Sequence, residues 1–265
     1  MKKNKIKYII VLILSMFLVY YFKDEITILF NDLYNNFSQN FIQENRYLLI
    51  LKGLRATLII SISSILIGTL IGFLLFLLRK SKIKLLSLLS KIIVNILQGT
   101  PVTVLLLIFY YVIFGKINVN PMFVAIITFS IYFSAYISEV FRGAYLSLNK
   151  SQIYSAYSLG FTKVQTLRYI IIPQSLSYII PIFKNESVSL IKSTSIAGYI
   201  SIMDLTKASD IIRNRTYEPF LPLIVTAIIY YFICLMIGKS LDCLYKRINH
   251  KVVKKSEKWC NFKIK

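Results

Sequence analysis

Three polar side chains in an otherwise apolar stretch share one side of a predicted helix. Asn185, Ser189 and Lys192 follow one another at spacings of four and three residues, which places them on one helix face. Glu186 lies about 240° around the helix from Lys192, so we expect it to meet a group on another helix. Charged side chains in a membrane span commonly mark pathways, although polar groups there also serve as packing contacts.

The residue types in this stretch are suited to a zwitterionic solute. Lys192 can meet a carboxylate group and Glu186 an ammonium group, because such a solute needs polar partners when it sheds its water. Thr194 follows on the same stretch. We therefore take Asn185, Glu186, Ser189, Lys192 and Thr194 as candidates for a translocation path.

A second candidate for the path is the break formed by Gly99, Thr100 and Pro101. Pro101 cannot donate to the helix ladder and clashes with the preceding turn, so a kink is predicted. Backbone groups freed at membrane depth must be buried in protein or line a wet cavity.

The elements that position these residues are predicted to be membrane-spanning helices. The chain has 265 residues, of which 56% are hydrophobic and 16% charged, whereas a soluble domain carries about a quarter charged residues. Its mean hydropathy is +0.65. Apolar blocks near the length of a bilayer crossing recur along it. We predict an all-α polytopic protein with about six spans: 8–22, 56–78, 92–114, 122–141, 176–200 and 220–237.

The distribution of charge predicts the orientation of the chain and excludes nucleic-acid binding. The net charge is +21, but the basic residues form short runs beside apolar blocks, and a basic stripe on a soluble fold is absent. With both termini cytoplasmic, the basic runs at 2–7, 79–91, 142–168 and 239–265 all lie inside, as the positive-inside rule requires.

Residues 8–22 allow two interpretations, a cleaved signal peptide or a retained anchor. The anchor is favoured because no small-x-small cleavage site follows; the next residues are Lys23, Asp24 and Glu25. The external polar segment up to residue 47 is far too short to be a ligand-binding domain. In the second span, Ser64, Gly68 and Gly72 form a face of small residues that predicts close helix contact.

A polar segment separates the fourth and fifth spans. We predict two short helices in it, the first capped by Ser151 and ended by Gly160, the second capped by Thr162. Pro173 then marks the bend into the fifth span. An amphipathic helix lying on the membrane surface is the alternative for this segment.

Several motifs, in order along residues 48–241, resemble the permease subunits of polar amino acid importers of the ATP-binding cassette (ABC) class. They are Leu51-x-Gly53-x3-Thr57, Gln98-Gly99-Thr100-Pro101, Glu139-Val140-Phe141-Arg142-Gly143, the segment around Ala156 and Gly160, and Asn185-x6-Lys192-Ser193-Thr194-Ser195. We call residues 142–173 the coupling segment, because the corresponding cytoplasmic loop of this family couples the permease to an ATPase.

This resemblance implies a five-helix type I permease core (48–245), preceded by an anchor region (1–47) and followed by a basic cytoplasmic tail (246–265). It implies a second permease copy or paralogue, a dimer of cytoplasmic ABC ATPases and an extracytoplasmic substrate-binding protein. The residues it assigns to ATPase coupling are Tyr154, Ser155, Ala156, Leu159, Gly160, Ile170 and Pro173. One departure is Tyr154-Ser155-Ala156, where the family usually has Glu-Ala-Ala.

We therefore expect a non-enzymatic permease in a bacterial cell membrane that imports polar amino acids. No phosphate-binding loop of the G-x4-G-K-[ST] type occurs, so ATP and Mg²⁺ are expected to be used by the partner ATPase, with no catalytic, cofactor or metal site in this chain. Alternatives are an ABC permease for another small solute and an ion-coupled secondary carrier, although the two related halves of many carriers are not evident.

Overall fold

A computed structural model describes residues 31–32 and 34–263, with side chains described up to residue 247. Every regular element in this part of the chain is a helix, as predicted. The predicted first span, 8–22, lies outside the described residues. The longer helices are α3 (Tyr47–Arg79), α4 (Lys84–Gly99), α6 (Pro121–Leu146), α9 (Ile172–Ser193), α10 (Leu205–Thr216) and α11 (Phe220–Lys263).

Shorter helices connect or extend the long ones. Between residues 38 and 263 these shorter helices are three α-helices, three π-helices and two 3₁₀-helices. They are α5 (Val102–Leu107), α7 (Lys150–Ser158), α8 (Lys163–Thr166), η1 (Ser38–Ile42), η3 (Ile108–Ile113), η4 (Leu167–Ile171), η2 (Gln43–Asn45) and η5 (Thr194–Ile200).

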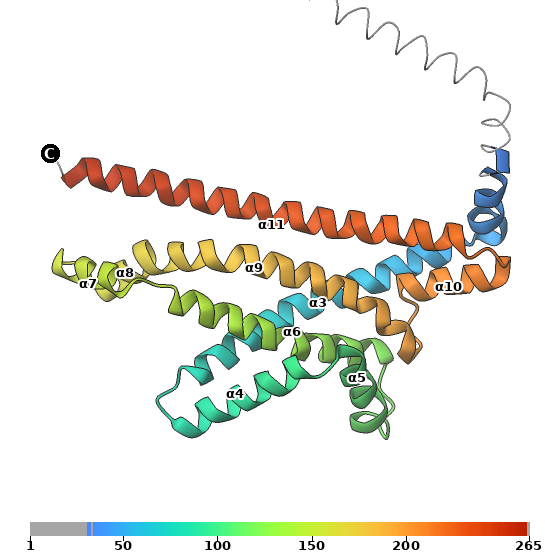
Figure 1. Cartoon of the computed structure of the whole chain (residues 1–265), viewed down its shortest axis with the longest axis horizontal. Coiled ribbons are helices and arrows are strands. Elements are labelled where there is room, and N and C mark those ends of the chain that lie inside the picture. The colour runs from blue at the N-terminus through green and yellow to red at the C-terminus, as the bar shows by residue number, and fades with distance from the viewer. Residues whose placement is uncertain (1–30, 33, 264–265) are drawn as a thin grey trace, which may run out of the picture.

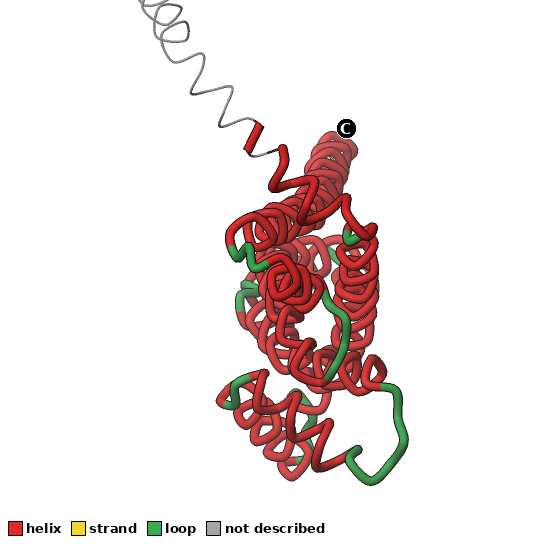
Figure 2. The backbone as a smooth tube through the Cα atoms, turned by 90° about the vertical axis from the view of Figure 1, so that its right-hand side faces the viewer, coloured by secondary structure: helices red, strands yellow, loops and turns green. Residues whose placement is uncertain are grey.

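The long helices lie side by side in one bundle. Figure 1 shows α3, α6, α9 and α11 running lengthwise through the molecule, with α11 alongside α9. Figure 2 shows the bundle from its end, with the helix axes close to the line of sight. The main core joins Ile60 of α3, Phe129 and Phe133 of α6 and Leu190 of α9.

Three described helices are long and apolar enough to cross a membrane: α3, α6 and α11 over Phe220–Arg247. They confirm the second, fourth and sixth predicted spans. The bent pair formed by α4 with 102–113 is apolar enough when taken together, and the number is four if this pair is one broken span and not a re-entrant loop. The predicted fifth span is α-helical only to Ser193 and continues as η5 to Ile200. α9 is less apolar than the others because it carries Lys184, Glu186 and Lys192. The total of six spans stays a prediction.

The predicted break in the third span is confirmed, and it is much sharper than a kink. The helix axes on either side of it enclose 106°. The bend arises because Thr100 and Pro101 are both extended (ψ 129° and 134°). The Thr100 hydroxyl donates to the carbonyl of Ile96 at 2.7 Å, which satisfies one backbone group at the end of α4.

The face of small residues on α3 packs against α6, as predicted. A Cβ atom added to Gly68 would lie 2.7 Å from the carbonyl oxygen of Ser130, and one added to Gly72 would lie 2.8 Å from that of Ser134. The Ser64 hydroxyl donates to the carbonyl of Ile126 at 3.2 Å. Only residues without a bulky side chain allow the two backbones this close.

Gly68→Val should therefore destabilise the bundle by about 1–3 kcal/mol, because the added side chain forces α3 away from α6. The measurement is the thermal unfolding midpoint of the purified protein in detergent. Leu70→Val is the matched control, since Leu70 lies on the same helix but is 68% exposed. Equal unfolding midpoints for the two variants would contradict the assigned contact.

Candidate functional site

The first helix of the coupling segment is α7, and its N-cap corrects a prediction. The side chain of Asn149, not that of Ser151, caps the helix: its Oδ1 accepts from the backbone N–H of Ser151 at 2.9 Å. Asparagine caps as well as serine does, and it stands at the extended position that precedes the first turn. α6 reaches Leu146, so the connection before α7 begins later than residue 142.

The turn and the second helix of the coupling segment form as predicted. Gly160 has φ +79°, in the left-handed region that favours glycine. Phe161 N–H donates to the carbonyl of Ala156 at 3.0 Å, which closes the end of α7. Thr162 Oγ1 accepts from Gln165 N–H at 3.3 Å while Gln165 Oε1 accepts from Thr162 N–H at 2.9 Å. This capping box starts α8.

A groove separates α7 from the start of α9. It has a volume of about 370 Å³ and is lined by Ser151, Gln152, Ser155, Ala156, Leu159, Phe161, Ile170 and Gln174. Gln174 Nε2 donates to Gln152 Oε1 at 2.6 Å and so bridges the two helices. The predicted residues Ser155, Ala156, Leu159 and Ile170 thus lie together around one groove, and Pro173 stands in the first turn of α9 beside it.

The outer surface of this segment is unusually apolar for a polar connection. Tyr154 is 67% exposed and Leu159 is 62% exposed, while Ala156 is buried against the rest of the segment. Val164 and Leu167 are exposed as well. The arrangement offers both a groove and protruding apolar side chains, which is what a protein-docking surface requires.

An ion-pair cluster fixes the base of the coupling segment. Glu139 of α6 binds Arg79 at the end of α3 and Arg142 one turn further along α6, the latter at 2.6 Å. The sequence motif contained Glu139 and Arg142, but it gave no indication of Arg79, which is sixty residues distant.

The polar face of α9 is confirmed as one exposed stripe. Asn185, Ser189 and Lys192 are all exposed in the isolated chain. Glu186 is partly buried, and it lies near enough to Tyr132 of α6 to act on it electrostatically. Tyr132 in turn contacts the hydroxyl of Tyr136 at 3.3 Å. The sequence did not predict these two tyrosines as neighbours of the site, because two aromatic residues within an apolar helix do not stand out from packing residues.

The remaining path candidates lie apart from this stripe. Thr194 is fully buried, and its hydroxyl donates to the carbonyl of Ile191 at 2.7 Å. Gly99 and Pro101 are exposed at the bend, with open space where a Cβ of Gly99 would lie. α5, which follows the bend, contacts η5, which follows α9. The two groups of candidates therefore come from neighbouring elements without forming one cluster.

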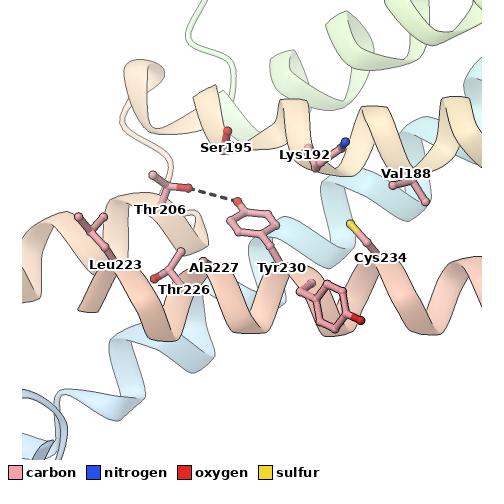
Figure 3. Close-up of a pocket in the computed structure, with 10 residues that line it drawn as sticks. Val188, Lys192, Ser195, Thr206, Leu223, Thr226, Ala227, Tyr230 and Cys234 are labelled. Atoms are coloured by element: carbon pink, nitrogen blue, oxygen red, sulfur yellow. Dashed lines mark hydrogen bonds between the residues drawn. The ribbon is translucent and has the colours of Figure 1, made fainter. Parts of the chain in front are cut away.

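Lys192 lines a cavity of about 640 Å³ between α9, α10 and α11 (Figure 3). Thr206 and Tyr230, whose hydroxyl oxygens lie 3.3 Å apart, form another part of its wall. None of the ion pairs found among the described side chains involves Lys192. The buried hydroxyl of Thr226, also in the wall, lacks a hydrogen-bond partner within the described residues. The cavity thus combines an unpaired cation with hydroxyl groups and apolar surface.

Gly53 and Thr57 have a structural role that the sequence did not reveal. The Thr57 hydroxyl accepts from the backbone N–H of Leu205 at 3.1 Å. A Cβ atom on Gly53 would lie 2.7 Å from the carbonyl oxygen of Asp204. Together these two residues of α3 hold the chain where it enters α10.

Asp204, at the same junction, is fully buried and caps α10. Its carboxylate accepts from Thr206 N–H at 3.0 Å and from Lys207 N–H at 3.2 Å. Burial raises the pKa of Asp204 above its usual value, although the hydrogen bonds act in the opposite direction. Asp204 itself lies after the fifth predicted span, which ends at residue 200.

One further ion pair was not anticipated from the sequence. Lys184 of α9 binds Asp242 of α11 at 2.7 Å and ties the two helices together. In the described part of the chain, no three His, Cys, Asp or Glu side chains are close enough to hold a metal ion.

Known proteins are similar to this chain over most of its length. Residues 64–254 match the family described as binding-protein-dependent transport system inner membrane component. The probable amino-acid ABC transporter permease protein YckA of Bacillus subtilis is 36% identical over 204 residues, covering 77% of this chain and 90% of YckA. The putative glutamine transport system permease protein GlnP of Rickettsia typhi is 33% identical over 207 residues, covering 77% and 94%.

A solved structure supports the same relationship. It is described as the crystal structure of an amino acid ABC transporter with histidines, and it superposes with a TM-score of 0.69 at 33% identity. The match covers 78% of this chain and 98% of the other. The similarity in sequence and the similarity in fold therefore indicate the same class of protein.

The raised pKa of Asp204 predicts a pH-dependent contribution to stability. A carboxyl group whose pKa is raised by folding favours the folded state at low pH, and this contribution is lost as pH rises through the folded-state pKa. The unfolding midpoint of the wild type should therefore rise relative to that of Asp204→Asn as the pH is lowered through the raised folded-state pKa of Asp204 towards the usual aspartate pKa of about 4. The other titratable groups are the same in both proteins. A difference between the two unfolding midpoints that stays constant with pH would therefore contradict the raised pKa of Asp204.

Proposed function

The chain belongs to the family of binding-protein-dependent transport system inner membrane components, and we propose that it is the permease subunit of an ATP-driven importer of polar amino acids. The observation that carries the proposal is the coupling segment, a grooved and apolar surface joined directly to the helix that bears Lys192. The names of the similar proteins, which include amino-acid and glutamine permeases, support the substrate class.

The coupling segment is the docking site for a cytoplasmic ABC ATPase. Tyr154 and Leu159 supply protruding apolar contacts, and the groove beside Ala156 accepts a side chain from the partner. The absence of Glu from the start of the motif changes the contact made at Tyr154 but leaves the turn at Gly160 intact. ATP and Mg²⁺ bind the ATPase, which hydrolyses the nucleotide.

Substrate reaches this chain from an extracytoplasmic binding protein and moves along α9. Lys192 binds the substrate carboxylate, while Asn185 and Ser189 on the same face replace lost water contacts. Glu186 lies on another side of α9, so it contacts the ammonium group at a separate point of the path. Their exposure in the single chain supports a path completed by a second permease copy or paralogue that covers the stripe. The positions of the basic runs support cytoplasmic termini and a location in a bacterial cell membrane.

Gly160→Val should reduce uptake by about tenfold or more, because a β-branched residue cannot adopt the left-handed conformation without strain. Gly160→Asn is the matched control, since asparagine tolerates that conformation and should retain most uptake. The measurements are uptake of labelled amino acid and co-purification of the ATPase, both normalised to the amount of permease in the membrane. Normal uptake by the Val variant would refute the docking role of the turn.

Loss of this gene should remove uptake of one polar amino acid from a labelled panel, and the wild-type gene should restore it. Lys192→Met keeps the length of the side chain but removes its charge, so the KM for that solute should rise about tenfold, as expected for loss of a charge-assisted contact. Lys52→Met, an exposed lysine on α3, is the control.

Three outcomes of this experiment would point elsewhere. An unchanged panel favours another solute, and uptake that follows an ion gradient instead of ATP favours a secondary carrier. A Lys192 variant with lower thermal stability but normal KM would make Lys192 a packing residue.

A further inference from the structure

The turn between α3 and α4 carries a basic cavity that the proposed function does not use. The cavity has a volume of about 400 Å³ and is lined by Ser81, Lys82, Lys84, Ser87, Leu88 and Lys91. The turn lies at the same end of the bundle as α7 and α8 (Figure 1). We call this cavity the α3–α4 basic cavity.

Its three lysines have no anionic partner within the described structure. Arg79 binds Glu139, and Lys80 lies over the ring of Tyr145, with its Nζ 3.9 Å from the ring centroid. Lys82, Lys84 and Lys91 are exposed and take part in none of the ion pairs of residues 34–247. No Asp or Glu occurs between Glu44 and Glu139. The cavity therefore holds concentrated positive charge that an anion from outside the chain can neutralise.

Two serine contacts fix the shape of the turn. Ser81 Oγ accepts from the backbone N–H of Ile83 at 3.2 Å, and Ser87 Oγ donates to the carbonyl of Arg79 at 2.9 Å. The turn is thereby tied to both α3 and α4. The lysines are presented from a shaped surface rather than from a loose loop.

Apolar surface continues from the cavity along α4. Leu85, Leu88, Leu89, Ile92 and Ile96 are all exposed on this helix. Such a surface stands in contact with hydrocarbon when a helix lies in a bilayer. Positive charge at the end of an apolar helix face matches a ligand that carries an anionic head and hydrocarbon chains.

We propose that the α3–α4 basic cavity binds the phosphate headgroup of an anionic phospholipid, whose acyl chains lie along α4. Lysine stems cover the adjoining apolar surface while their ammonium groups contact the phosphate. Basic pockets between membrane helices at the cytoplasmic side are suited to anionic headgroups, because each cation there attracts the negative leaflet. A zwitterionic lipid of the same chain length lacks the net charge that the cavity selects.

The test is lipid binding to the purified full-length protein in detergent, measured by native mass spectrometry. The probes are phosphatidylglycerol and phosphatidylcholine with identical acyl chains. The wild type should prefer phosphatidylglycerol, and Lys82→Gln/Lys84→Gln/Lys91→Gln should bind it at least about tenfold more weakly. Binding of phosphatidylcholine should not change.

A second triple variant controls for the loss of charge. Lys52→Gln/Lys116→Gln/Lys207→Gln removes three exposed lysines outside the turn and should bind phosphatidylglycerol as the wild type does. Equal weakening in both variants would show general attraction only and would overturn the proposal. Unfolding midpoints of both variants confirm that each remains folded.

Other outcomes would also overturn it. If inorganic phosphate at equal concentration displaced the lipid, the cavity would be a site for free phosphate. If the first variant kept wild-type lipid binding but lost a co-purifying subunit, the cavity would serve an acidic segment of that protein. Because no transport is measured, failure of the import proposal would leave this result unaffected.

Discussion

The close contact between α3 and α6 is the constraint on which the other features depend. Helices in a bilayer gain little from excluding water, so they associate through packing and polar contacts. Gly68 and Gly72 bring the backbone of α3 against the carbonyl oxygens of Ser130 and Ser134. This contact places the end of α3 beside Glu139, where Arg79 completes the ion-pair cluster. The α3–α4 turn and the coupling segment therefore both extend from one fixed point.

A nearly unbroken helical path connects the coupling segment to the polar stripe of α9. α8, η4 and α9 follow one another without an intervening loop from Lys163 to Ser193. The π-helical segment η4 and Pro173 make the helix irregular where it leaves the coupling segment. The ion pair of Lys184 with Asp242 then joins α9 to α11. Under the proposed function, a movement at Gly160 reaches Lys192 along this helix and takes α11 with it.

Local patterns were predictable from the sequence where the partner of a residue lies nearby or where backbone geometry alone decides. Gly160 and Thr162 are examples, because a left-handed turn and a capping box involve only adjacent residues. The small-residue face of α3 also follows from its spacing alone. The N-cap of α7 was harder to predict. Asn149 and Ser151 are both suitable residue types, and only the extended backbone conformation of Asn149 identifies it as the cap.

Contacts between distant segments could not be predicted in this way. Gly53 and Thr57 were visible as a motif, but their partners at Asp204 and Leu205 lie about 150 residues away. The 106° bend comes from two consecutive extended residues, Thr100 and Pro101, whereas a proline alone predicts only a kink. That Lys192 lines a cavity with Tyr230 likewise required the position of α11, which no periodicity on α9 specifies.

Two groups of basic side chains among the described residues differ in whether the fold neutralises their charge. Arg79, Arg142 and Lys184 each have a carboxylate partner at a helix contact, so their charge is neutralised within the fold. Lys192 and the lysines of the α3–α4 basic cavity lack such partners among the described residues. An unpaired cation near hydrocarbon is costly, and an arriving anion removes that cost. The cavity at Lys192 is walled by α9, α10 and α11. Under the proposed function, its occupant is a solute that binds only transiently. At the α3–α4 turn the cations adjoin the apolar face of α4, which suits an anion that itself belongs to the membrane.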